Sequence, residues 1–485
     1  MSSETRLSVG VSGLDTVLSG GLLPKRSYMV RGGPGTGKTI LGLQYLLAGI
    51  EAGESTLYLS FEEPPANIVH NAARLGFDVS AIEFLDLTPS GNVLSDTRPY
   101  SIFGPDEVEI GTMTETISET VDRVQPDRIV LDSLNRMEAL TADRYQFRQQ
   151  VISLTKRLTN SGGTVLFTTQ PTESAPDDEL QFLADGTVEL GFGPKGRTLQ
   201  VTKFRGSSFQ SGLHTVRLTD SGMVVYPNLV PGDYNREFVA ETVSSGVDGL
   251  DSLLNGGIER GTVTVLSGPT GVGKTTTGTS FAVEAASRGE RSALYLFEES
   301  TGTFRHRCSE INLPVDELTA AETLAVEAVE PVTISPDEFA SAVRTEVETH
   351  GTKLVMIDGI SGYRLSMRGD DDNIVTELHS LCRYLKNMGV TTILLDDVSK
   401  VTGDIEVTSH RISYLADNVV VLRYLEVDGE LRKAVGVLKK RASDFERSLR
   451  SFEITAEGIQ IGDKLTGLRG ILSGTPEMIG HQDHD

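Results

Sequence analysis

Short runs of apolar residues alternate with longer segments of helical character along most of this chain. In the first half the apolar runs cover 56–61, 83–87, 128–132 and 164–169, and the helical segments cover 65–75, 112–124 and 147–159. Continuous rather than alternating hydrophobicity is typical of strands that are covered on both faces. The pattern therefore predicts an α/β fold, in which a mostly parallel sheet is flanked by helices.

The end of this half has a different pattern. Strand-like segments at 186–190, 198–204 and 213–218 follow one another without helices between them. Successive strands that lack a crossover element pair as hairpins. We therefore expect antiparallel hairpins at one edge of the sheet.

Two glycine-rich turns of the same form each lie between an apolar run and a helical segment. They read Gly32-Gly33-Pro34-Gly35-Thr36-Gly37-Lys38-Thr39 and Gly268-Pro269-Thr270-Gly271-Val272-Gly273-Lys274-Thr275. The glycines let backbone N–H groups turn toward phosphate oxygens, the lysines reach the terminal phosphates, and the last threonines offer hydroxyls to Mg²⁺. Both turns are therefore predicted to bind a nucleoside triphosphate. No Asn-Lys-x-Asp guanine-reading motif occurs, which favours ATP over GTP.

The two turns belong to an internal duplication. The loop lysines are 274 − 38 = 236 residues apart, and the same offset relates Gly13-Leu14-Asp15 to Gly249-Leu250-Asp251 and Phe61-Glu62-Glu63 to Phe297-Glu298-Glu299. Repetition at one period implies duplicated domains. We expect a first domain at 1–227, a linker at 228–241, a second domain at 242–475 and a short acidic tail at 476–485.

Composition narrows the class of protein. The 485 residues carry a formal net charge of −24, which opposes binding to nucleic acid or anionic lipid. Two cysteines, Cys308 and Cys382, are too few for a disulfide framework. The N-terminus lacks the order of a secretory signal, and nowhere do eighteen apolar residues run together. We expect a cytoplasmic protein without a membrane-inserted segment.

Several carboxylates follow directly after predicted strands. Asp132 and Asp358 end apolar runs, at the carboxyl ends of strands, where open α/β sheets bind their ligands. They are predicted to hold Mg²⁺ together with the threonines of the two loops. The pairs Glu62-Glu63 and Glu298-Glu299 follow the strand that comes after the helix of each phosphate-binding loop. One carboxylate of each pair could accept a proton from the water that attacks the γ-phosphate, and the other could bind Mg²⁺ or hold the base. A solvated acidic turn is the alternative.

Two basic pairs occur late in each half, far in sequence from the loop of the same half. They are Lys203 with Arg205, and Lys439 with Arg441. Such residues could reach the γ-phosphate bound by a neighbouring subunit. A surface salt-bridge pair is an equally acceptable interpretation.

Together these motifs resemble the KaiC family of the RecA superfamily in its two-domain form, from Leu7 to about Pro476. The resemblance rests on Gly13-Leu14-Asp15 with Gly20-Gly21, the Phe-Glu-Glu strand ends, Lys-x-Arg, and Leu218-Thr219-Asp220-Ser221-Gly222-Met223. It implies tandem RecA-like P-loop domains, ATP bound between protomers of a hexameric double ring, and slow hydrolysis in the first domain. It also implies Glu62 and Glu298 as the leading catalytic carboxylates, the four basic residues as sensors acting in trans, and regulatory protein partners whose identity the sequence leaves open.

The second half departs from the family pattern. In this family the second domain can phosphorylate itself on a neighbouring Ser-Thr pair, but the matching residues here are Ser413 and Tyr414. A tyrosine hydroxyl lies further from its backbone than a threonine hydroxyl, so only modification of Ser413 remains as a hypothesis. Gly359 follows Asp358 where the first half has Ser133, and Ala442 replaces the glycine that matches Gly206. These changes indicate that the second site is the more altered one.

Two other classes share these motifs. A DNA-dependent recombinase or helicase would pass nucleic acid along loops that here are acidic: 171–179 in the first half, and a segment with Asp396, Asp397 and Asp404 in the second. Acidic loops repel phosphate, so we do not expect nucleic acid as a partner. A signalling scaffold would bind ATP without significant turnover. Intact Lys, Thr, Glu and Asp in both halves favour retained hydrolysis.

Overall fold

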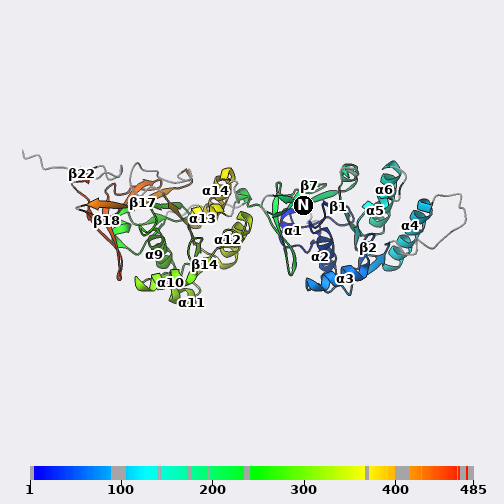
Figure 1. The fold of residues 1–485 in the computed structure, drawn as a ribbon, viewed down its shortest axis with the longest axis horizontal. Coiled ribbons are helices and arrows are strands. Elements are labelled where there is room, and N and C mark those ends of the chain that lie inside the picture. Colours follow the sequence, from blue (N-terminus) through cyan, green and yellow to red (C-terminus); the bar gives the residue numbers. More distant parts are fainter. Residues whose placement is uncertain are drawn as a thin grey trace, which may run out of the picture. The chain divides into compact units, whose positions relative to one another are not determined.

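The computed structural model describes residues 5–88, 105–139, 141, 144–171, 177–193, 196–233, 241–365, 371–398, 414–427, 429–466, 468–469 and 477–478. Contacts divide the chain into two compact units, Met1–Asn228 and Leu229–Asp485 (Figure 1). Each unit contains a nine-stranded sheet, and each is described by itself below.

The first unit is built on a sheet of strand order β3-β2-β4-β5-β1-β6-β7-β8-β9. Its strands are β1 (Ser27–Gly32), β2 (Thr56–Ser60), β3 (Glu83–Asp86), β4 (Arg128–Asp132), β5 (Thr164–Thr169), β6 (Gly186–Gly193), β7 (Gly196–Phe204), β8 (His214–Thr219) and β9 (Gly222–Tyr226). Its helices are α1 (Leu14–Val17), α2 (Lys38–Glu51), α3 (Pro65–Arg74), α4 (Pro105–Val124), α5 (Asn135–Ala139), α6 (Arg144–Asn160) and α7 (Asp178–Leu183).

Helices cover both faces of the parallel part of this sheet. Alternate strand residues such as Tyr58 and Val130 pack with α2 and α3, and their neighbours such as Leu57 and Ile129 pack with α4 and α6. Since successive side chains of a strand point to opposite faces, the continuous apolar runs supply both cores at once. The predicted α/β fold with a mostly parallel, helix-flanked sheet is confirmed.

The antiparallel hairpins expected from the segments at 186–190, 198–204 and 213–218 are confirmed, since β6 pairs antiparallel with β7, β7 with β8 and β8 with β9. The sequence pattern did not predict that β6 also pairs in parallel with β1, which places β1 inside the sheet. The reason is that α7 lies between β5 and β6 and carries the chain back to the other end of the sheet, so β6 enters as a last crossover strand.

The second unit repeats this topology with the order β14-β13-β15-β16-β12-β17-β18-β19-β20. Its strands are β10 (Thr242–Val243), β11 (Ile258–Glu259), β12 (Val263–Gly268), β13 (Ser292–Leu296), β14 (Leu324–Ala328), β15 (Leu354–Asp358), β16 (Thr391–Asp397), β17 (Asn418–Val427), β18 (Glu430–Lys440), β19 (Arg450–Thr455), β20 (Gly458–Lys464), β21 (Leu468–Arg469) and β22 (Glu477–Met478). Its helices are η1 (Pro231–Asp233), α8 (Asp248–Leu253), α9 (Lys274–Ser287), α10 (Thr301–Glu310), α11 (Val315–Ala320), α12 (Pro336–His350), α13 (Ile360–Leu365) and α14 (Asp371–Asn387). One face of its sheet packs with α9 and α10, and the other with α12 and α14.

Two further sequence expectations can be compared with this structure. Among the described residues, no helix is long and apolar enough to cross a membrane. Cys308 and Cys382 are both buried and form no disulfide.

Candidate active site

The first phosphate-binding loop leads from the end of β1 into α2. Gly35 and Gly37 have positive φ angles of 70° and 109°, which side chains rarely tolerate, and Gly37 caps the helix. A Cβ atom added at Gly33 or Gly35 would meet nothing within 4 Å, so open space lies above the loop. The Lys38 ammonium folds over the loop and donates to the carbonyls of Gly32, at 2.7 Å, and Gly33, at 2.9 Å. Loop and lysine thus frame a cradle of the shape that a phosphate chain needs.

Asp132 lies beside this cradle at the carboxyl end of β4. Its carboxylate accepts three hydroxyl hydrogen bonds, from Thr39 at 2.8 Å, Tyr58 at 2.6 Å and Thr168 at 2.5 Å. A hydroxyl and a carboxylate are the hard oxygen donors that suit Mg²⁺, which keeps several waters and takes few protein ligands beside the phosphates. Among the described residues, no group of three or more His, Cys, Asp or Glu side chains could hold a metal ion by itself. Thr39 and Asp132 therefore fit a metal that arrives with a nucleotide.

The two glutamates of the first unit point to different neighbours. Glu62 is exposed beside the cradle, and its Oε1 accepts a 2.6 Å hydrogen bond from the Ser133 hydroxyl. Glu63 instead accepts a 3.3 Å bond from the amide of Asn71, on α3. Burial lowers the pKa of Lys38, and the charges of Asp132 and Glu62 act against that change. Glu62 is thus the glutamate that shares an electrostatic environment with the cradle.

The second cradle has the same backbone but a different neighbour for its lysine. Gly271 and Gly273 have φ angles of 79° and 117°, and the Lys274 ammonium donates to the carbonyls of Gly268, at 2.9 Å, and Pro269, at 3.0 Å. It also forms a 2.6 Å ion pair with Asp397, the last residue of β16. In the first unit the matching position after β5 is Gln170, which is neutral.

Asp358 has lost most of the hydroxyl donors that surround Asp132. The residue that matches Tyr58 is Leu294, and Leu395, which pairs with Asp358 across the sheet, matches Thr168. The Asp358 carboxyl is only 7% exposed, and burial raises its pKa to about 7. The hydroxyl of Thr275 lowers that pKa, whereas the charges of Glu298 and Glu299 raise it. Thr275 and Asp358, the two residues expected at the second metal site, are therefore neighbours, and Asp358 is more buried than Asp132.

The glutamates of the second unit differ in the same way. A Cβ atom at Gly359, which has φ +96°, would lie 2.8 Å from Cγ of Glu298, so the hydroxyl that Ser133 offers to Glu62 has no equivalent. The pKa of Glu298 is raised, first by burial and next by the charge of Asp397. Glu299 pairs with Arg307, where the first unit uses Asn71. Both units thus have the same Phe-Glu-Glu sequence, but the charged and polar neighbours of the two glutamates differ between the units.

The two basic pairs lie toward the end of the strands that is opposite the cradle of their own unit. Thr187, which pairs with Lys203, lies beside Met29 near the start of β1, whereas the cradle begins at Gly32. The Lys203 ammonium donates to the carbonyls of Gln181 and Ala184, each at 2.6 Å, and Arg205 donates to Phe182 at 3.3 Å. Met29 precedes Gly32 by three residues, about 10 Å at the usual rise per residue, and both basic side chains bond backbone carbonyls at that end of the strand, so they do not join their own cradle.

The second basic pair has the same placement. Lys439 pairs with Val419 of β17 and donates to the carbonyl of Ala416 at 2.6 Å. Arg441 faces Asp417, with 3.6 Å between its nitrogen and the carboxylate oxygen. Burial lowers the pKa of Lys439, as it does that of Lys203. Neither unit therefore brings its own basic pair to its own phosphate loop.

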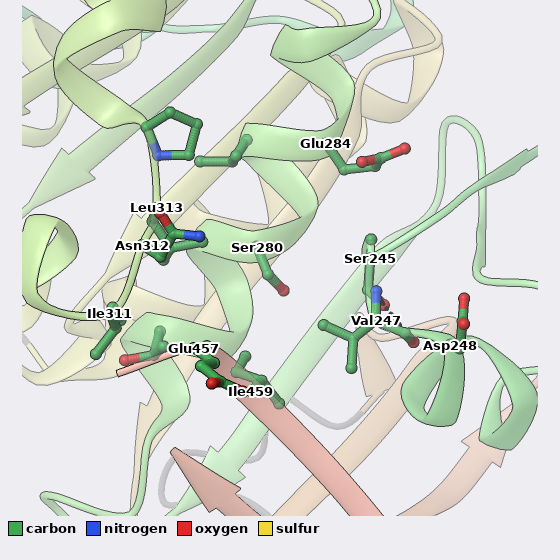
Figure 2. Close-up of a pocket in the computed structure, with 15 residues that line it drawn as sticks. Ser245, Val247, Asp248, Ser280, Glu284, Ile311, Asn312, Leu313, Glu457 and Ile459 are labelled. Atoms are coloured by element: carbon green, nitrogen blue, oxygen red, sulfur yellow. Dashed lines mark hydrogen bonds between the residues drawn. The ribbon is translucent and has the colours of Figure 1, made fainter. Parts of the chain in front are cut away.

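A cavity of about 370 Å³ opens beside α9 in the second unit. Figure 2 shows Ser280 and Glu284 of α9 on one side of it and Asn312 on another. Its lining also includes Thr276, the residue directly after the last residue of the second phosphate loop. In the first unit the matching volume holds Gln44, which donates to the carbonyl of Met223 and accepts from its N–H. The residue at the matching position of the second unit is the smaller Ser280, which lines the cavity.

Some sequence predictions concern residues that are not described, and one is wrong. Ser413, residues 172–176 and Asp404 lie outside the described residues. Tyr414 is described: it stacks on His379, with its hydroxyl 3.3 Å from Nδ1. Asp396 and Asp397 were expected in a loop, but they are the last two residues of β16, because that strand continues as far as the phosphate loop beside which it pairs.

Sequence reasoning missed several neighbours of the site. Tyr58, Thr168 and Arg307 were not singled out, and Asp397 was assigned to another role. Tyr58 and Thr168 belong to strands that the sequence pattern identified, at 56–61 and 164–169, whereas the helix of Arg307 and the strand of Asp397 were not identified. The signal for Tyr58 was available in the comparison of the two halves at the offset of 236 residues. A tyrosine in one half opposite a leucine in the other, at a strand position next to a predicted metal ligand, marks such a difference.

Comparison with known proteins agrees with this geometry. The family model "ATPase: KaiC" matches the chain twice, at residues 7–230 and 243–466. The circadian clock oscillator protein KaiC of Synechococcus elongatus is 27% identical over 97% of this chain and 91% of its own length. KaiC3, a circadian clock protein of Synechocystis, is 27% identical over 97% of this chain and 94% of its own. A KaiC from Parathermosynechococcus lividus is 26% identical over 97% and 88%. With two phosphate cradles, each set into a RecA-like sheet, and two matches to the family model, this chain belongs to the KaiC family of ATPases.

Proposed function

We propose that the chain binds ATP at both cradles, hydrolyses it slowly in the first unit, and forms a nucleotide-dependent ring of copies of itself. The observation that carries the hydrolytic part is the constellation of Lys38, Thr39, Glu62 and Asp132 around one cradle, held by short hydrogen bonds. The matching residues of the second unit keep the binding elements but lack the hydroxyl that orients Glu62.

The proposed reaction follows from what each side chain faces. Backbone N–H groups of the loop and the Lys38 ammonium bind the phosphate chain, and Thr39 with Asp132 would hold Mg²⁺. Bound Mg²⁺ supplies neutralisation of charge on the phosphate oxygens. Water attacks the γ-phosphorus, the bond to the oxygen of the leaving ADP breaks, and Glu62 accepts the proton. Ser133 fixes the carboxylate that accepts it.

Ring formation is supported by the placement of the basic pairs. Lys203 lies about 10 Å along β1 from the start of its own cradle, at the usual rise per residue, and both basic side chains bond backbone carbonyls there, so they would reach a γ-phosphate only in a neighbouring copy. Lys439 and Arg441 repeat the arrangement. We propose that both pairs act in trans and that the ring is a hexamer, as the family resemblance implies. Light scattering with and without ATP and Mg²⁺ tests this, and an unchanged monomer in both conditions would contradict it.

The cavity of the second unit is our proposed place for the nucleoside half of ATP. It begins at Thr276, next to the last residue of the cradle, and its volume falls in the range of sites that enclose small ligands. Leu313→Trp would fill it. We expect this change to weaken binding of nucleotide to the second cradle, whereas the matching Phe77→Trp change in the first unit should leave the second cradle unaffected.

Replacement of the proposed base tests the hydrolytic assignment. Glu62→Gln, made together with Lys274→Ala so that only the first cradle is active, should reduce the rate of ADP release at least about a hundredfold, the usual contribution of a general base. Glu63→Gln should have a much smaller effect, because Glu63 is bound to Asn71 instead. Undiminished turnover when both glutamates are replaced would refute the assigned base.

Self-phosphorylation of Ser413 is a separate proposal that rests on the family resemblance. The serine oxygen would attack the γ-phosphorus, ADP would leave, and Glu298 would accept the serine proton. Phosphopeptide mapping after incubation with ATP and Mg²⁺ tests it. An unmodified Ser413 would remove the proposal without affecting the ATPase assignment.

A further inference from the structure

Asp397 occupies a position that none of the recognised motifs explains. Its Oδ1 lies 2.6 Å from the Lys274 ammonium, and the Thr270 hydroxyl donates to the same oxygen at 3.2 Å. The two charged side chains are only 6% and 19% exposed. The carboxylate therefore sits against the phosphate loop itself and holds the one lysine that the loop directs at the terminal phosphates.

The position follows from the register of the sheet. Asp397 pairs with Gly268, the residue at which β12 opens into the loop. At this register position the Asp397 side chain contacts Lys274 and Thr270 of the loop. In the first unit the same place after β5 carries Gln170, and Lys38 donates to the carbonyls of Gly32 and Gly33. The carboxylate is therefore a particular feature of the second unit and not a requirement of the fold.

Among the described residues, the second cradle has more negative than positive side chains around it. Two cations, Lys274 and Arg307, face four carboxylates, those of Glu298, Glu299, Asp358 and Asp397. Because Arg307 forms an ion pair with Glu299, Lys274 is the cation nearest to Asp397. A triphosphate that enters the cradle brings more negative charge to the same ammonium. Because one ammonium cannot make short contacts with a carboxylate and a phosphate without bringing two anions together, the incoming phosphate must displace Asp397.

We propose that Asp397 is an internal anion that competes with the terminal phosphates for Lys274, and so sets the affinity of the second cradle below that of the first. This inference rests on the proposed binding of nucleotide at both cradles. Asp397 therefore affects nucleotides according to the number of their phosphates. A nucleotide whose phosphates reach Lys274 must displace Asp397, whereas the affinity of a nucleotide that does not reach Lys274 is unaffected. The neutral side chain of Gln170 leaves the first cradle without this competition.

Exchange of the two residues tests the proposal. The second cradle is isolated with Lys38→Ala and the first with Lys274→Ala, and the double variant gives the blank. Binding of a fluorescent ATPγS analogue is then titrated at constant pH and Mg²⁺. Asp397→Gln should tighten binding at the second cradle by about 10- to 100-fold, the usual range for a hydrogen bond to a charged group. Gln170→Asp should weaken binding at the first cradle by a similar factor.

Two controls separate this competition from a general loss of charge or of fold. Asp463→Asn removes one exposed negative charge from the same unit, on β20, and should leave binding unchanged. A fluorescent AMP analogue lacks the terminal phosphates, so its affinity should not respond to Asp397→Gln. Thermal unfolding of each variant shows whether the unit is intact, and if Asp397→Gln lowers its stability, the Gln170→Asp arm decides.

The outcomes are distinct for the two proposals. If neither isolated cradle binds the ATPγS analogue in the parent chain, the proposed function fails. If both bind it and the exchange leaves both affinities unchanged, the competition by Asp397 is overturned while the proposed function stands. If Asp397→Gln tightens binding of the AMP analogue as much as that of the ATPγS analogue, the competition by Asp397 is also overturned. The change in affinity would then be a structural effect of the substitution and would not depend on the terminal phosphates.

Discussion

The hydroxyl of Ser133 offers the most specific test of how the first site positions Glu62, its proposed base. Ser133 donates to Oε1 of Glu62 at 2.6 Å, and its oxygen also lies 3.3 Å from Oδ1 of Asn135. Ser133→Ala deletes this donor and leaves the cradle intact, because Glu62 and Asn135, the two partners of this hydroxyl, lie outside the loop. The second unit already shows the arrangement without the donor, with Gly359 in the same place.

The expected size of the effect follows from the type of bond. A hydrogen bond to a charged group contributes about 1.5–3 kcal/mol, but Glu62 is exposed, so solvent reduces this to about 1–2 kcal/mol. If that energy orients the base in the transition state, the turnover number should fall about 5- to 30-fold. The affinity for nucleotide should stay within about twofold, because ground-state binding does not use the bond.

The assay is ADP release under single-turnover and steady-state conditions, with the Lys274→Ala change present so that only the first cradle contributes. Ser133→Thr keeps a hydroxyl and should retain most of the turnover. A turnover number that is unchanged in Ser133→Ala would refute the positioning role. A rise in Kd that accounts for the entire loss would show that Ser133 supports binding instead.

Three further changes test other contacts. Tyr58→Phe removes a hydroxyl from a carboxylate and should lower the free energy of unfolding of the first unit by about 1.5–3 kcal/mol in urea titrations, against about 1 kcal/mol for Tyr45→Phe, whose hydroxyl bonds a neutral carbonyl. Glu259→Gln breaks a buried ion pair with Lys440 and should cost the second unit about 3–5 kcal/mol at pH 7. Burial alone would raise the pKa of Glu259, but hydrogen bonds from Ser443 and Lys440 outweigh it and lower that pKa, so the contribution is present above about pH 4.3 and is lost as the pH falls through the folded-state pKa. Gly37→Ala would place a Cβ 2.5 Å from Cε of Met223 at φ +109° and should abolish nucleotide binding at the first cradle, whereas Gly53→Ala, also at positive φ but in open space, should not.

Each of these has an outcome that would count against the reasoning. Equal losses for the two tyrosine variants would mean that the charge of Asp132 adds nothing to its hydrogen bond. A Glu259→Gln penalty that is constant from pH 7 to pH 3 would mean that the carboxylate is not ionised in the folded protein. Normal binding in Gly37→Ala would mean that the loop relaxes without losing its form.

Much of the fold follows from local pattern. The bounds predicted for the strands at 128–132 and 164–169 agree with β4 and β5 residue for residue, because both are short apolar runs, buried except for Asp132, with polar residues at each end. The parallel pairing of β6 with β1 was not predictable from its own sequence, since a strand that enters a sheet by a short helix looks the same as one that enters by a turn.

The candidate site shows the same division. Glycine spacing alone locates both cradles, because positive φ angles at those positions leave few alternatives to glycine. The neighbours of Asp132 could not be found that way: Tyr58 and Thr168 belong to separate strands, and only the register of three adjacent strands brings them to one carboxylate. Asp397 is the clearest case, since sequence pattern assigns it to an acidic loop, while strand pairing assigns it to Lys274.

The central claim is that both cradles bind an adenine nucleotide through their loop lysines. Equilibrium dialysis of the intact chain with radiolabelled ATPγS and Mg²⁺ measures this directly, as the number of nucleotides bound per chain at saturation. We predict two, falling to one in Lys38→Ala and in Lys274→Ala, and to none when both lysines are replaced. A chain that binds no nucleotide, or whose binding is indifferent to both lysines, would contradict the account.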